Sequence, residues 1–352
     1  MSVFPHEGGD VAAHGLVEVD PGTRIACRDA QRTLTERNLL DHFGRQFADT
    51  SLDAHFLTTL HLAIKTAPLV LLSAGRRARA TLERYAGALF GSTSPRYLRL
   101  HAASRNADPQ QRALHERFMA MRLLDQISDA TTVESAGRCF LTAIDHVQLD
   151  DLTSIVETVF VLDASGTLTL AAPGAADDQQ IIVPQQVRIV ILLEEGISLH
   201  SLPASVLRCA AIVEVPPDAT IPNAVPINAP PIGYERLLRR VLEGEPDDAH
   251  LPDTLQPRAS DELVRLLWRA GETLTRADRQ GAHAAVCAAF DSNGTGLFDT
   301  NHAQHNATLA YDAYLLTRIA WRLRRSVDFE IQRDLTRFLR LRYERTPQQA
   351  VA

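Results

Sequence analysis

The sequence contains almost no lysine. Lys65 is the only one among 352 residues, so 35 of the 36 basic side chains are arginine. A phosphate-binding loop of the G-x-x-x-x-G-K-[ST] type needs a lysine whose compact ammonium reaches the outer phosphates. An arginine binds anions through a planar fork and does not reproduce that contact. The composition therefore excludes a working loop of this type away from Lys65.

Cysteine and long apolar runs are also scarce. The four cysteines, all scattered singly, are Cys27, Cys139, Cys209 and Cys287. This pattern disfavours a zinc or disulfide framework and favours reduced thiols. No apolar run approaches the ~18 residues of a membrane span, and no signal peptide is recognised. We therefore expect a cytoplasmic chain without a membrane segment, and we predict no metal site.

Strong positive charge is absent as well. A net charge of −7 and a pI near 6.0 disfavour non-specific nucleic-acid binding as the main activity, although they leave contact with DNA open. The sequence also lacks G-x-S-x-G, C-x-x-C and H-E-x-x-H motifs, so the corresponding hydrolase, thioredoxin and zincin classes find no support.

One stretch, residues 60–91, has the outline of a nucleotide-binding core. The apolar run Leu69–Leu72 is typical of a strand buried on both faces, and helical spacing follows the next turn. A phosphate loop occupies this position between strand and helix. The aligned octet here is Ala74, Gly75, Arg76, Arg77, Ala78, Arg79, Ala80 and Thr81. The final threonine matches the motif, whereas alanine replaces the lysine and both required glycines are missing.

Four further apolar runs alternate with helical patterns. They are residues 97–100, 139–145, 187–193 and 210–215, and a hairpin is expected over 160–170. The third strand ends in Asp145-His146, where a nucleoside triphosphatase has Asp-Glu to hold magnesium and activate water. The pattern predicts an α/β fold with a mostly parallel five-stranded sheet.

Composition also suggests the domain boundaries. Residues 1–30 are predicted to be a mobile N-terminal segment, and residues 31–215 the α/β core. A proline-rich linker is expected over 216–231, and residues 232–346 carry helical patterns throughout. The sequence therefore predicts one α/β domain followed by an all-helical domain.

The succession resembles the AAA+ domain of McrB-type proteins, the GTP-using motors of methylcytosine-dependent restriction systems. The matching pieces are LHLAIKTAPLVLLSA, FLTAIDHVQLDDLTSIVETVF, the hairpin, VPQQVRIVILL and LPASVLRCAAIVEV. The resemblance implies a P-loop core over residues 50–215 with a helical lid. It places the sensor asparagine position at Glu194 and the arginine position at Cys209, with Arg208 as a shifted substitute.

The resemblance implies a protein that has lost catalysis. The loop lysine, both loop glycines, the second acid and the sensor asparagine are all replaced, so we expect no hydrolysis and no catalytic residue. The vestigial nucleotide site comprises Ala74, Gly75, Arg79, Ala80, Thr81, Asp145, His146 and Glu194. We expect an assembly or recognition subunit, and the family association suggests a bacterial anti-phage or DNA-restriction system as its setting. It would form a homo-oligomer, or a hetero-oligomer with an active motor or nuclease subunit.

Two alternatives remain open at this point. One is a sensor that holds ATP or GTP through Arg79, Thr81 and Asp145 without turnover; the other is a DNA-binding subunit of a defence complex. Otherwise no cofactor is predicted. Arg76, Arg77 and Arg208 are candidate interface residues, and unpaired arginines at a helix N-terminus favour an anionic partner there.

A second motif resembles an EF-hand loop. Residues 291–302 place oxygen-bearing side chains at loop positions 1, 3, 5 and 9 and a glycine at position 6. His302 stands where the bidentate glutamate is required. We therefore predict a polar connection between two helices, with His302 and His305 exposed to solvent.

Overall fold

A parallel sheet lies at the centre of the chain. The structure is a computed structural model that describes residues 36–90, 96–103, 106–132, 139–156, 160–162, 168–171, 180–197, 201–216, 219–221, 258–291, 293–323 and 328–344. The five strands of the sheet are β1 (Leu69–Ser73), β2 (Tyr97–His101), β3 (Phe140–Val147), β7 (Val187–Leu193) and β8 (Ala211–Glu214). They are ordered β2-β3-β7-β1-β8, and every neighbouring pair is parallel. The predicted α/β class with a five-stranded sheet is confirmed.

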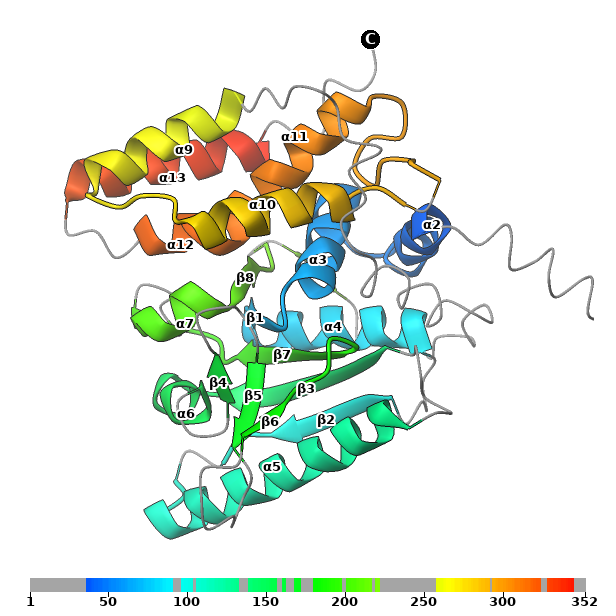
Figure 1. Ribbon diagram of the computed structural model, residues 1–352, viewed down its shortest axis with the longest axis vertical. Coiled ribbons are helices and arrows are strands. Elements are labelled where there is room, and N and C mark those ends of the chain that lie inside the picture. The colour runs from blue at the N-terminus through cyan, green and yellow to red at the C-terminus, as the bar shows by residue number, and fades with distance from the viewer. Residues whose placement is uncertain are drawn as a thin grey trace, which may run out of the picture. The chain divides into compact units, whose positions relative to one another are not determined.

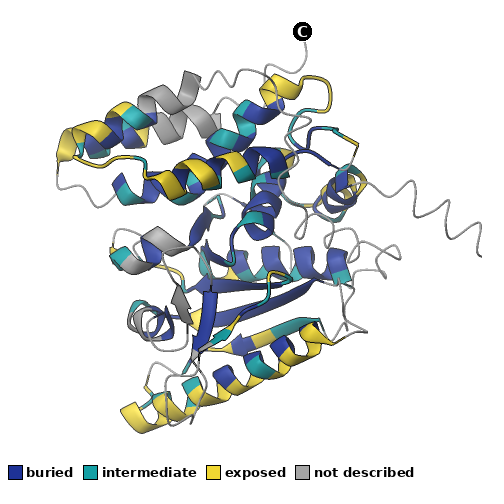
Figure 2. Ribbon diagram, in the orientation of Figure 1, coloured by how far each residue is buried: buried dark blue, intermediate teal, exposed yellow. Residues whose placement is uncertain are grey.

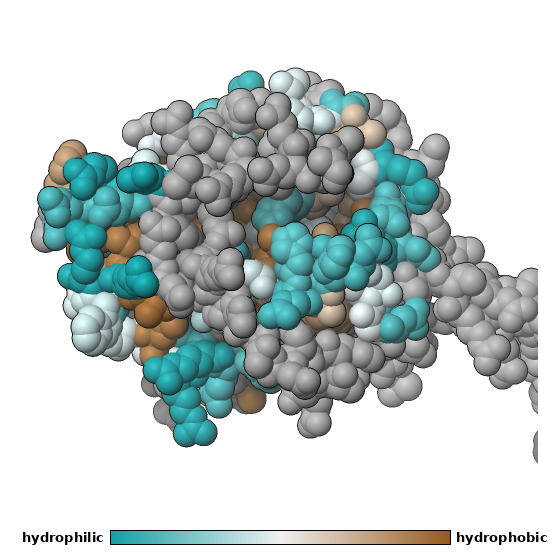
Figure 3. All heavy atoms as spheres, turned by 90° about the horizontal axis from the view of Figure 1, so that it is seen from above, coloured by the Kyte–Doolittle hydropathy of each residue, from teal (hydrophilic) through white to brown (hydrophobic). Residues whose placement is uncertain are grey.

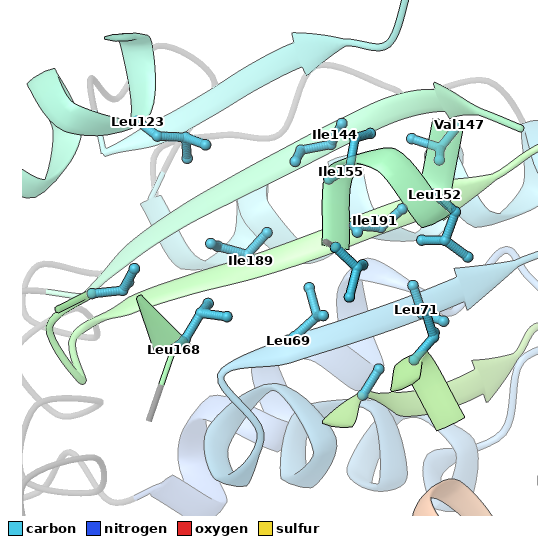
Figure 4. Close-up of a cluster of buried hydrophobic side chains, with 14 of the residues drawn as sticks. Leu69, Leu71, Leu123, Ile144, Val147, Leu152, Ile155, Leu168, Ile189 and Ile191 are labelled. Atoms are coloured by element: carbon cyan, nitrogen blue, oxygen red, sulfur yellow. The ribbon is translucent and has the colours of Figure 1, made fainter. Parts of the chain in front are cut away.

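The inner strands β1 and β7 are buried at every position, which explains their apolar runs. Leu69 and Leu71 point to one side, where they join Ile189, Ile191 and other residues in one hydrophobic cluster (Figure 4). Strand alternation sends the side chains of Val70 and Leu72, also fully buried, to the other side. A parallel sheet needs this double cover because its crossover helices lie on its faces.

Helices cover the sheet in two groups. The helices of this part of the chain are α2 (Glu36–Gln46), α3 (Ala54–Thr66), α4 (Gly75–Phe90), α5 (Pro109–Thr131), α6 (Leu149–Ser154) and α7 (Ala204–Cys209). Residues of α5, α6 and α7 belong to the same cluster as Leu69 and Leu71. The helices α3 and α4 contact β1 and β7 respectively (Figure 1). Figure 2 shows the buried strands between these helices, and the exposed outer side of α5.

A small antiparallel sheet accompanies the large one. It is ordered β4 (Phe160–Leu162), β5 (Leu168–Ala171) and β6 (Gln180–Ile182). The predicted hairpin is confirmed, since Val161 pairs with Thr169 in antiparallel register. The strand β6 was not predicted, because three residues are too few to show an alternating pattern.

After residue 258 the named elements that the structure describes are all helices, joined by turns and loops. The elements are α9 (Arg258–Arg269), α10 (Arg276–Ala288), α11 (Ala303–Tyr314), the π-helical segment η4 (Leu315–Ile319), α12 (Ala320–Leu323) and α13 (Phe329–Glu344). They share a second hydrophobic cluster that includes Leu266, Val286 and Leu335. Figure 3 views the molecule from the side of these helices and shows described hydrophobic residues lying between hydrophilic ones.

The helical part also contacts the α/β part. Trp321 donates from its indole nitrogen to the backbone oxygen of Ile212 on β8 over 3.2 Å. All described residues belong to one compact unit. The predicted mobile segment 1–30 lies outside the described residues, and so does most of the predicted linker 216–231. Among the helices that the structure describes, none has the length and apolarity required to cross a membrane.

Candidate functional site

The predicted site residues meet at one edge of the parallel sheet. Asp145 and His146 stand at the end of β3, Glu194 follows β7, and Ala74 and Gly75 follow β1. The carboxyl ends of parallel strands share an edge, and ligands of open α/β sheets bind outside that edge. Three separate segments of sequence thus contribute to one location.

The turn after β1 has an unusual backbone. Ala74 has φ 105° and Gly75 has φ 52°, so two successive residues lie in the region that favours glycine. A Cβ atom on Gly75 would lie 2.8 Å from the Cβ of Glu195. The turn is therefore packed against an acidic residue at the place where a phosphate loop would present its backbone to an anion.

Asp145 is the most buried charged group of the site. Its side chain accepts a hydrogen bond from Arg79 Nη2 at 3.0 Å and lies 2.7 Å from Arg79 Nε. Arg99 Nη2 donates to it over 2.7 Å, and the backbone N–H of His146 over 2.8 Å. Burial acts to raise the pKa of Asp145, but the hydrogen bonds from Arg79, Arg99 and His146 outweigh it and lower that pKa. Asp145 is therefore ionised and fully partnered.

His146 adopts a left-handed backbone with φ 60°. Arg79 Nη2 lies 2.8 Å from its Nε2, and Glu194 Oε1 lies 3.2 Å from its Nδ1. A guanidinium only donates hydrogen bonds, so Nε2 accepts from Arg79 and Nδ1 faces Glu194 as the donor. Glu194 also accepts from Gln148 Nε2 at 3.4 Å.

Three residues that the sequence did not predict complete the cluster. Arg99 on β2 joins Asp145 to Glu83 of α4, with its Nη1 donating to Glu83 Oε1 over 2.7 Å. His101, at the end of β2, lies directly beside Asp145 in the strand register, and its ring centroid is 5.6 Å from that of His146. Burial and the charge of Arg99 lower the pKa of His101. The position of His101 at the end of a neighbouring strand was the signal that could have identified it.

The remaining loop positions do not form a phosphate clamp. The hydroxyl of Thr81 is buried and donates to the backbone oxygen of Arg77 over 2.8 Å, which leaves it turned into its own helix. Ala80 is half-buried on α4, with a methyl group in place of an ammonium. The alignment of these residues with a phosphate loop is compatible with the fold, but no described group replaces the lysine contact.

The interpretation of the loop arginines as unpaired was wrong for Arg77 and Arg79. Arg79 is paired with Asp145, and Arg77 Nη2 lies 3.8 Å from Glu195 Oε1. Arg76 is exposed on the first turn of α4. Arg208 lies in α7, and its side chain is outside the described part of the structure. Because carboxylates of the chain itself accompany Arg77 and Arg79, their presence gives no argument for an external anion.

The loop that resembles an EF-hand is organised by its own backbone. Asp291 Oδ1 accepts from the N–H groups of Asn293 and Thr295 at 2.8 and 2.9 Å. Asp299 accepts from the N–H groups of Asn301 and His302, and His305 Nδ1 lies 2.7 Å from its Oδ2. The loop connects α10 and α11, and His302 and His305 are exposed, as predicted.

The single lysine belongs to a buried network away from the sheet edge. Lys65 Nζ donates to both carboxylate oxygens of Glu36 at 2.9 Å and also to the backbone oxygen of Ala288. His61 lies between Glu36 and Tyr85, at 2.7 Å from the carboxylate and 2.9 Å from the hydroxyl. The four side chains are almost fully buried, so they join α2, α3, α4 and α10 and are closed to solvent.

The sheet-edge cluster thus contains carboxylates whose partners are already present. Its described groups form ion pairs and hydrogen bonds with one another. They present neither an activated nucleophile nor a loop of free N–H groups with the geometry for a triphosphate. No family model matches the chain, and no curated protein matches it in sequence.

Proposed function

We propose that the chain is a catalytically inactive relative of AAA+ P-loop proteins that acts as an assembly or recognition subunit. The observation that carries this proposal is the internal pairing of Asp145 with Arg79 and Arg99. In a nucleoside triphosphatase the corresponding carboxylate holds the magnesium ion of the nucleotide. Here the guanidinium groups of Arg79 and Arg99 are paired with the carboxylate oxygens that would coordinate the magnesium ion.

The loop after β1 supports the same proposal. Phosphate binding requires free backbone N–H groups and close approach, for which the glycines of the motif are needed. The backbone and Cβ of Glu195 instead lie against Gly75 and fill the space beside the turn. A five-stranded parallel sheet with this loop after its first strand is nevertheless compatible with a P-loop-like core. In this proposal the helices from Arg258 onward correspond to the lid.

An exposed surface supports a role through protein contacts. The α5 stripe consists of Leu114, Phe118 and Met121, which are 70, 54 and 58% exposed. Their spacing of four and three residues places them on one face of α5. Groups of exposed large apolar side chains mark interaction surfaces more often than isolated ones do. A second copy of the chain fits this role because a two-fold contact uses the same stripe on both subunits.

The experiment is light scattering of the purified chain over a wide concentration range. We expect an oligomer whose mass falls towards the monomer in Phe118→Glu. The control is Trp268→Glu, which changes another strongly exposed aromatic side chain, on α9, and should leave the mass unchanged. A wild type that is monomeric at every concentration, and in mixtures with candidate motor or nuclease subunits, would contradict the proposed function.

The analogy with restriction motors suggests a setting in bacterial anti-phage defence. This part of the proposal depends on the family resemblance alone and not on a described site. An adjacent gene for an intact motor or nuclease subunit would support it, and co-purification of the two proteins would test it directly.

A further inference from the structure

We propose that His101, Asp145 and His146 form a binding site for one divalent transition-metal ion. In the metal-free chain, the guanidinium of Arg79 takes the position of that ion. The assembly role does not require a metal ion. The metal-site proposal and the proposed assembly role can therefore be refuted independently of each other.

The backbone brings three ligand atoms together. One ligand atom of each of His101, Asp145 and His146 lies within 4.8 Å of the other two. His101 is the register partner of Asp145 in the neighbouring strand. Successive residues of a strand normally face opposite sides, but the φ of 60° at His146 interrupts this alternation. As a result, His146 Nε2 lies 4.0 Å from Asp145 Oδ2.

Arg79 contacts the lone pairs that a metal ion would use. Its Nη2 lies 3.0 Å from Asp145 Oδ1 and 2.8 Å from His146 Nε2, and its Nε lies 2.7 Å from Asp145 Oδ2. A cation therefore already sits between the imidazole and the carboxylate. The Arg79 side chain is 27% exposed and belongs to the first turns of α4, so it can swing towards solvent when an ion replaces it.

The charge of the cluster favours the exchange. Three carboxylates (Glu83, Asp145 and Glu194) face two guanidinium groups (Arg79 and Arg99), so three negative and two positive charges leave one negative charge. Replacing the single charge of Arg79 with a divalent ion brings the sum to zero. Arg99 remains paired with Glu83 and Asp145 after the exchange.

The donor set selects the class of metal. Two imidazole nitrogens and one carboxylate oxygen suit zinc and neighbouring transition metals, whereas magnesium and calcium prefer oxygen ligands only. A transition metal bound by imidazole can therefore displace Arg79 where magnesium does not. Glu194, which faces Nδ1 of His146, supplies the outer carboxylate that commonly orients a metal-binding histidine.

Isothermal titration of the full-length chain with zinc chloride tests the proposal. We expect one equivalent of zinc in the wild type, and about tenfold or greater loss of affinity in His101→Ala and in His146→Ala. Arg79→Met should bind zinc more tightly than the wild type, since it removes the competing cation. Cobalt(II) absorption provides a second measurement, because ligation by two imidazoles and a carboxylate gives characteristic visible bands.

The control is the double variant His302→Ala/His305→Ala. These exposed histidines lie beside Asp299, so they form the most obvious unrelated zinc site among the described residues. The control should retain the wild-type affinity. Equal zinc binding by the wild type and by both site variants, confirmed as folded by circular dichroism, would overturn the proposal. If Arg79→Met binds zinc and the wild type does not, the proposal is wrong for the natural chain.

Discussion

Lys65→Met tests the buried network most sharply. The substitution retains most of the side-chain volume but removes the ammonium that donates to both oxygens of Glu36. Lys65 and Glu36 are 4 and 1% exposed, so the remaining carboxylate would be buried without its main counter-charge. Breaking a buried ion pair from one side typically costs about 3–5 kcal/mol. Because His61 remains in contact with Glu36, we expect Lys65→Met to lower the free energy of unfolding by about 3 kcal/mol, the lower end of this range.

The free energy of unfolding from urea titration, followed by circular dichroism, measures this cost. The double variant Glu36→Gln/Lys65→Met should cost less than the sum of its two single variants, by about 2 kcal/mol. Arg269→Ala provides a matched control at an exposed ion pair, 2.8 Å from Asp334, and should cost less than about 1 kcal/mol. The reasoning would be refuted if Lys65→Met cost less than about 1 kcal/mol. It would also be refuted if the cost of the double variant equalled the sum of the costs of its two single variants.

Three further predictions concern the loops and the site. Burial acts to raise the pKa of Asp299, but hydrogen bonds from His305 and two backbone N–H groups lower it to about 2, so Asp299→Asn should destabilise the chain at neutral pH. That difference should shrink as the pH falls below about 4 and through about 2, because the carboxylate is protonated first in the unfolded state and then in the folded state. Gly75→Ala should cost on the order of 2 kcal/mol, since its Cβ would overlap Glu195 in a left-handed backbone. Ala80→Lys together with His146→Glu should not produce ATP or GTP hydrolysis, because the loop still lacks its glycines.

Each of these predictions has a direct check. Urea titrations of Asp299→Asn and wild type at several pH values would contradict the first if their difference stayed constant. Gly44→Ala is the control for the second: nothing lies within 4 Å of its added Cβ, and it should stabilise α2 by up to about 1 kcal/mol. If Gly75→Ala and Gly44→Ala changed the free energy of unfolding equally, the argument from overlap with Glu195 would be wrong. Phosphate release from ATP or GTP by Ala80→Lys/His146→Glu would show that hydrolysis does not need the missing loop glycines.

The buried strands of the parallel sheet were predictable because they are short apolar runs, whereas the three-residue β6 was not predicted. Residues 187–193 were predicted with the bounds that the structure has, since a strand covered on both faces needs apolar side chains at every position. The helical pattern predicted after residue 232 is interrupted at a point that no sequence feature marked. The structure divides it at the π-helical segment Leu315–Ile319, which the spacing of apolar residues did not reveal.

The contacts of the site were harder to predict than its position. The end of an apolar run identified Asp145 and His146, and the family resemblance identified Glu194; the structure brings the three to one sheet edge. The pairing of Arg79 with Asp145 depends on how a side chain of α4 folds over the end of β3, and no local pattern encodes this. His101 enters the cluster through the register of β2 against β3, which is set by the whole sheet.

Phosphate release from ATP and GTP is the measurement that tests the central claim most directly. The account predicts that the purified chain, with magnesium present, releases phosphate no faster than a blank, because Asp145 is held by Arg79 and Arg99 and the loop lacks its lysine and glycines. Turnover at the rates of ordinary motor proteins, abolished in Asp145→Ala, would contradict it.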